Sequence, residues 1–152
     1  MVKVGLLGAG RSGAVHARAI TAHSGSALVA VSDVVAENAA RLADTYGAVV
    51  RTSDEIIADP AIDAVLIATS TDTHCDFIEA ATAAGKAVLC EKPVDLSLSR
   101  ARACSEYVSA TDQPVMIGVY RRFDPSFIAM RSALLSGEIG KAEMLSITSF
   151  DP

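Results

Sequence analysis

One stretch near the amino terminus constrains the fold more than any other. The apolar run 2–7 leads directly into Gly8-x-Gly10-x-x-Gly13, and an alanine-rich segment of helical character follows. Gly8 lets the chain turn sharply off a strand, Gly10 leaves room for a diphosphate, and Gly13 lets the helix pack closely on the strand. The unpaired N–H groups that open this helix would face the anion. The motif therefore predicts a strand, loop and helix that bind a dinucleotide.

An acidic residue lies where such a unit needs one. Asp33 follows the second apolar run, 27–31, about twenty residues beyond the glycines. Its carboxylate would accept hydrogen bonds from the adenosine ribose and would repel a 2′-phosphate, and Val34 and Val35 supply no cation. We therefore expect NAD as the cofactor in preference to NADP. The alternative for Asp33 is an ordinary turn aspartate.

The rest of the chain alternates strands with helices. Further apolar runs, separated by segments with helical spacing, are found at 48–50, 64–68, 87–90 and 115–118. Continuous apolar runs are typical of parallel strands buried on both faces, which accounts for a hydrophobic content of 51%. We predict an α/β fold with a doubly wound parallel sheet, a Rossmann fold, over residues 1–119.

Composition argues against several functional classes. The formal charge is −5 without a basic cluster, which argues against nucleic acid and anionic membrane as partners. No apolar run is long enough to cross a bilayer. The three cysteines have no C-x-x-C spacing, so neither a disulfide framework nor a metal site is expected. We expect buried thiols in a reducing compartment, the cytoplasm.

The pattern changes after residue 119. Asp124-Pro125 is typical of a helix start, and Gly137 of a helix end. Residues 142–150 then alternate as a half-exposed strand would, without an evident partner strand. We expect a helix and then a strand in this segment. The exposed edge of that strand would pair with another chain, so we also expect a homo-oligomer.

Four motifs together resemble one family. They are Gly8-x-Gly10-x-x-Gly13-x-x-His16, Thr69-Ser70-Thr71-Asp72-Thr73-His74, Cys90-Glu91-Lys92-Pro93 and Arg121-Arg122-Phe123-Asp124-Pro125. Their order and approximate spacing resemble the glucose–fructose oxidoreductase/inositol dehydrogenase family (Gfo/Idh/MocA), and the last two are most similar to its myo-inositol 2-dehydrogenase branch.

The resemblance implies an enzyme that oxidises a secondary alcohol of a polyol or sugar with NAD or NADP. It also implies a C-terminal substrate domain with a large open sheet. By the same resemblance, residues 120–152 would be the crossover helix and first strand of that domain, a truncated second α+β domain. Such a chain should bind the cofactor and lack turnover. The alternative is a non-catalytic NAD(P)-binding sensor or scaffold.

Site residues follow from the motifs and their places after strands. The expected cofactor-binding residues are Gly8, Gly10, Arg11, Ser12, Gly13, Asp33, Thr69, Ser70, His74 and Glu91. The resemblance gives Lys92 a catalytic role in a proton relay and makes Arg122 a substrate-binding residue.

Several of these side chains have a plainer alternative. Lys92 could be a surface lysine, Glu91 a solvated carboxylate, and His74 a cap or packing residue. Arg122 could pair with Asp124 or with the missing domain. His16 is expected to be structural, because it would point along the first helix.

Overall fold

The computed structural model describes residues 1–148, and the chain divides into two compact units after Gly118. The first unit is built on a six-stranded parallel sheet with the order β3-β2-β1-β4-β5-β6. The strands are β1 (Val2–Leu7), β2 (Ser26–Ser32), β3 (Val49–Val50), β4 (Ala64–Ile67), β5 (Ala87–Cys90) and β6 (Val115–Ile117). Because strands are added outward on both sides of β1 and β4, the sheet is doubly wound, and the predicted fold class is confirmed.

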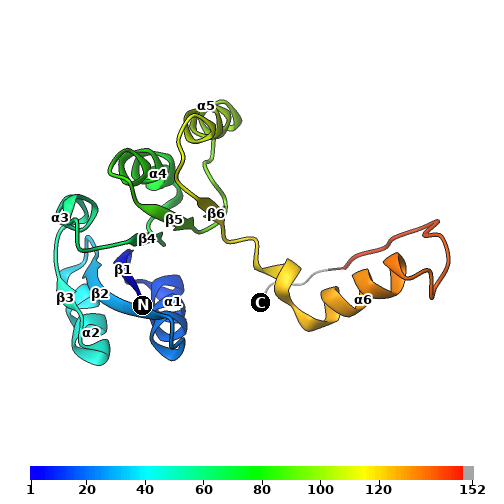
Figure 1. The fold of residues 1–152 in the computed structure, drawn as a ribbon, viewed down its shortest axis with the longest axis horizontal. Helices are drawn as coiled ribbons and strands as arrows, with labels where there is room; N and C mark the ends of the chain where they lie inside the picture. Colours follow the sequence, from blue (N-terminus) through cyan, green and yellow to red (C-terminus); the bar gives the residue numbers. More distant parts are fainter. Residues whose placement is uncertain (149–152) are drawn as a thin grey trace. The chain divides into compact units, whose positions relative to one another are not determined.

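Helices cover the two faces of this sheet in two groups (Figure 1). On one face lie α1 (Arg11–Ala22) and α2 (Ala36–Tyr46), and on the other lie α3 (Ser53–Ala58), α4 (His74–Ala83) and α5 (Leu98–Ser109). A short 3-10 helix, η1 (Thr71–Thr73), precedes α4. The crossover from one face to the other takes place between β3 and β4, so β1 and β4 mark the point where the winding reverses.

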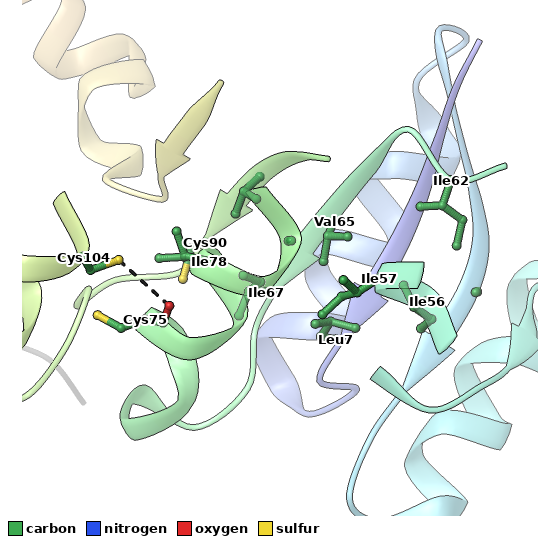
Figure 2. Packing of buried hydrophobic residues seen from close by; sticks show 13 residues of the cluster. Leu7, Ile56, Ile57, Ile62, Val65, Ile67, Cys75, Ile78, Cys90 and Cys104 are labelled. Carbon is green, nitrogen blue, oxygen red and sulfur yellow. Dashed lines mark hydrogen bonds between the residues drawn. The ribbon is translucent and has the colours of Figure 1, made fainter. Parts of the chain in front are cut away.

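The two faces are packed with different side chains. Under α1 and α2 the core uses small residues, among them Ala9, Ala17 and Ala39, which let these helices approach the strands closely. Under α3, α4 and α5 the core contains isoleucines and all three cysteines, as Figure 2 shows. The side chains of β1 alternate between these faces, because successive residues of a strand point to opposite sides.

All three cysteines are buried, as the sequence led us to expect, and their thiols are free. Burial raises the pKa of the Cys75 and Cys90 thiols to about 12, and it raises the pKa of Cys104 as well. Within residues 1–148, no group of His, Cys, Asp and Glu side chains could hold a metal ion. None of the helices in the same range is both long and apolar enough to cross a membrane.

The second unit begins at Val119 and contains η2 (Tyr120–Phe123) and α6 (Pro125–Leu135). Asp124 caps α6: its Oδ1 accepts hydrogen bonds from the backbone N–H groups of Ser126 at 2.8 Å and Phe127 at 3.4 Å. The expected helix start is therefore confirmed.

The expected strand 142–150 is not formed over its described part. Residues 142–148 are neither helix nor strand, and 149–150 lie outside the described residues. An alternating pattern becomes a strand only when a neighbouring backbone pairs with it, and no strand of the described chain does so. The homo-oligomer expected from this strand therefore stays a prediction.

Candidate cofactor-binding site

The strand register aligns the carboxyl ends of the sheet in one row. Ser32, Leu7, Ile67, Cys90 and Ile117 are neighbours across it. The residues that follow these strands therefore share one edge, and this edge carries most of the expected site residues. In open α/β sheets, ligands bind at this edge, where the winding reverses.

The glycine loop forms a cradle between β1 and α1. Gly8 has a φ of +95°, and a Cβ there would lie 2.4 Å from the Ala68 carbonyl oxygen. A Cβ at Gly13 would lie 2.0 Å from the Gly8 oxygen, whereas one at Gly10 would meet nothing within 4 Å. Gly8 and Gly13 thus permit close packing, and Gly10 borders open space. The loop fits a diphosphate.

The start of α1 faces the same space. Gly10 is the N-cap residue of α1, and no side chain caps this end of the helix. Arg11 and Ser12 form the exposed first turn. Backbone N–H groups and the positive end of the helix dipole are therefore directed at the place where the diphosphate would bind.

Asp33 is fixed by backbone groups on both sides. Its Oδ2 accepts a hydrogen bond from the Ala9 N–H at 2.5 Å, and its Oδ1 accepts one from the Val35 N–H at 2.8 Å. Each carboxylate oxygen can accept a further bond. Asp33 lines a cleft of about 260 Å³ together with Gly8, Gly10, Thr69 and Ser70, among others. Next to it, Val34 is fully exposed and offers no cation.

The segment after β4 forms part of the cleft wall and is held by its own hydrogen bonds. Thr69 and Thr73 join their Oγ1 atoms at 2.7 Å, and the Thr73 N–H donates to the Ser70 carbonyl oxygen at 3.0 Å. Thr69 and Ser70 both line the cleft. The structure thus brings this expected pair next to Asp33 and the glycine loop.

His74 is buried, with 1% of its surface exposed. Its Nδ1 lies 2.8 Å from the carbonyl oxygen of Pro93, and its Nε2 lies 3.2 Å from that of Thr69. The ring therefore joins the loop after β4 to the loop after β5. This contact corresponds to the packing role that the sequence left open for His74.

Glu91 is bound by side-chain and backbone partners rather than solvated. Its Oε1 lies 2.7 Å from Nε2 of His16, and its Oε2 accepts a hydrogen bond from the Lys92 N–H at 3.2 Å. Sequence reasoning missed this contact, because it placed the His16 side chain along the helix. The three-residue spacing from the buried Gly13 was the available signal, since it puts both residues on one face of α1.

Lys92 is the second residue after β5, which ends at Cys90, and it is exposed. The peptide bond between Lys92 and Pro93 is cis. An exposed ammonium group at this edge can donate hydrogen bonds to a hydroxyl oxygen of a ligand and can stabilise negative charge that develops there.

Arg122 belongs to the second unit. It lines a groove of about 630 Å³ together with Arg131, Phe127 and other residues of α6 and η2. Asp124 uses its carboxylate as a helix cap, and no ion pair within residues 1–148 joins it to Arg122.

Comparison with known proteins gives one family. Residues 2–119 match the family model GFO_IDH_MocA, described as an oxidoreductase family with an NAD-binding Rossmann fold. The inositol 2-dehydrogenase of Rhizobium meliloti is 52% identical over 151 residues, which are 99% of this chain and 46% of that protein. The chain thus spans about half the length of the curated relatives that it matches.

Solved structures agree with this match. A myo-inositol dehydrogenase from Corynebacterium glutamicum superposes with a TM-score of 0.87 at 42% identity, over 93% of this chain and 43% of that one. A scyllo-inositol dehydrogenase from Lactobacillus casei, with NAD(H) and scyllo-inositol bound, gives 0.87 at 29% identity, over 92% of this chain and 42% of that one.

Proposed function

Because the chain belongs to the Gfo/Idh/MocA oxidoreductase family, whose matching domain is an NAD-binding Rossmann fold, we propose that the whole protein oxidises a secondary alcohol of an inositol-like polyol or sugar with NAD. One observation carries this proposal. A glycine cradle, a fixed Asp33 carboxylate and the exposed Lys92 lie along one edge of one parallel sheet. The relatives named inositol dehydrogenases support the substrate class.

The glycine loop and Asp33 would hold the cofactor. The first turn of α1 would donate N–H groups to the diphosphate, with Gly10 leaving it room. Asp33 would accept hydrogen bonds from the ribose hydroxyls, and its charge would disfavour a 2′-phosphate. Bound NAD supplies the hydride acceptor.

Lys92 would act on the substrate hydroxyl. Its ammonium group would donate a hydrogen bond to the oxygen and stabilise the negative charge that grows there. The carbon would pass a hydride to NAD, and the oxygen would pass its proton to another member of the relay, which acts as the base. Arg122 would donate hydrogen bonds to other hydroxyl oxygens of the polyol. We propose that other members of the proton relay belong to the length of the relatives that this chain does not span. This chain alone would then bind NAD without turnover.

Calorimetric titration tests the cofactor part of the proposal. The 152-residue chain should bind NAD saturably and NADP about tenfold more weakly or worse, a difference of about 1.4 kcal/mol. Equal affinity for both nucleotides would contradict the role of Asp33. Absence of binding by either would contradict the site as a whole.

A steady-state assay tests the chemistry. In a protein of the full length of the relatives, Lys92→Ala should lower kcat with myo-inositol by about 10² to 10⁴ and leave the Kd for NAD within about twofold. Lys3→Ala, at the opposite end of the sheet, is the matched control. Binding of NAD without turnover by the unaltered full-length protein would indicate a sensor or scaffold instead.

A further inference from the structure

The contact between His16 and Glu91 links the helix at the diphosphate site to the reacting end of the site. We propose that His16 is a positioning residue for Lys92 and acts through Glu91; this inference rests on the proposed function. His16 Nε2 and Glu91 Oε1 are 2.7 Å apart, although 75 residues separate them in the chain. The two side chains are only 23% and 20% exposed. A contact so short and so well shielded holds both groups in place.

The closeness of α1 to the sheet brings His16 into reach. Gly13 lies one turn earlier on the same face of α1, and its backbone packs so tightly that a Cβ would lie 2.0 Å from the Gly8 oxygen. Ala17, the next residue along, is completely buried. The helix whose first turn faces the diphosphate therefore carries, on its second turn, the partner of Glu91.

Glu91 passes this restraint on to Lys92. The Glu91 N–H donates to the Ile67 carbonyl oxygen at 2.9 Å, which fixes its backbone to β4. A Cβ at Gly118 would lie 3.4 Å from the Glu91 carboxylate, so the end of β6 packs directly against it. The second carboxylate oxygen of Glu91 then accepts a hydrogen bond from the Lys92 N–H at 3.2 Å.

A second contact restrains the next residue from the other face of the sheet, where the His74 ring binds the Pro93 carbonyl oxygen. The backbone of Lys92 is thus restrained from both faces.

The strand order predicts which half of the cofactor depends on this restraint. Asp33, after β2, would bind the adenosine ribose on one side of β1, so the nicotinamide half lies toward β4 and β5. Loss of the His16 contact should therefore weaken binding of NAD. Binding of ADP-ribose, which lacks the nicotinamide, should change little.

Amide hydrogen exchange tests the restraint without any cofactor. In the 152-residue chain, His16→Ala should speed exchange of the Lys92 N–H about tenfold relative to that of Val31 in β2, the effect of losing a hydrogen bond to a charged group. His16→Gln, which keeps a donor, should restore much of the protection. His23→Ala is the control, because the His23 side chain has one hydrogen bond within residues 1–148, which its Nδ1 accepts from the Gly25 N–H in the same turn. Glu91→Gln, equal in size, provides a second variant should His16→Ala not fold.

Calorimetry with NAD and ADP-ribose tests the functional consequence. His16→Ala should weaken NAD binding at least about fivefold and leave the Kd for ADP-ribose within about twofold. Equal effects on Lys92 and Val31 exchange, or on both ligands, would show a merely structural role and overturn the inference. Failure of the unaltered chain to bind NAD would instead refute the proposed function, and the exchange data would still decide whether His16 restrains Lys92.

Discussion

The two sides of β1 fix their key side chains by different means. On the β2 side, both carboxylate oxygens of Asp33 are bound by backbone N–H groups close to the glycine loop or to Asp33 itself. On the β5 side, Lys92 depends on side chains from helices on opposite faces, His16 from α1 and His74 from α4. One side is thus held by backbone N–H groups, and the other by side-chain contacts between distant segments of the chain. The difference teaches that only the β5 side can be loosened by substitutions far from the site.

The largest effect should come from a substitution that disturbs both sides of the site at once. Gly13→Ala would place a Cβ 2.0 Å from a backbone oxygen, so α1 must move away from the sheet. We expect a loss of about 3 kcal/mol in the free energy of unfolding, measured with urea, together with loss of NAD binding.

Gly10→Ala is the matched control for this change. Its backbone φ is −71°, and a Cβ there meets nothing within 4 Å. It should weaken NAD binding, by filling the space for the diphosphate, while stability changes by less than about 0.5 kcal/mol. Equal stability of the two variants would contradict the close packing of α1.

The next effect should fall on the loops after β4 and β5 and leave Asp33 in place. His74→Leu leaves the carbonyl oxygens of Thr69 and Pro93 without their ring partner, and we expect a loss of about 2 kcal/mol in unfolding free energy. ADP-ribose binding, measured by calorimetry, should persist. His23→Leu at an exposed turn should cost much less. Loss of ADP-ribose binding in His74→Leu would erase the distinction between the sides.

The effect of a third substitution, Asp33→Ala, should be confined to the β2 side. Asp33→Ala removes the acceptor for the Ala9 N–H and for the ribose, so the Kd for NAD should rise about tenfold or more. Exchange of the Lys92 N–H should not change, because no described contact joins the two. Asp44→Ala, an exposed carboxylate on α2, is the control, and faster Lys92 exchange in Asp33→Ala would be the contrary result.

The smallest effect should be a sensitivity of the β5 side to alkali. Burial raises the pKa of Cys75 and Cys90 to about 12 from a usual value near 9. Thiols with a raised pKa in the folded state stabilise it fully below pH 9, and this contribution is lost as the pH rises from 9 toward 12. Urea unfolding at pH 8 and 9.5 should differ by about 1 kcal/mol. Cys90→Ala should reduce that difference, and an unchanged difference would speak against burial as its cause.

The same contrast explains what the sequence could reveal. The six strands follow from apolar runs, and the positions of Gly8 and Asp33 follow from the spacing of one motif, because their partners are backbone atoms that any sequence supplies. The His16–Glu91 contact needs to be found among side chains 75 residues apart, and it depends on how closely α1 packs. Residues 142–148 are a second case in which local sequence was not enough. Their alternating pattern fits a strand, but a strand requires a partner that the local sequence does not encode.

The double attachment of Asp33 bears on how cofactor preference can evolve. The carboxylate that would select the ribose also holds the loop at Ala9, so a substitution at position 33 would change selectivity and loop structure together. Val34 is fully exposed and free of that constraint. A lineage drifting toward a phosphorylated cofactor would therefore find its accessible first step at Val34, by gaining a cation there, and would reach Asp33 only afterwards.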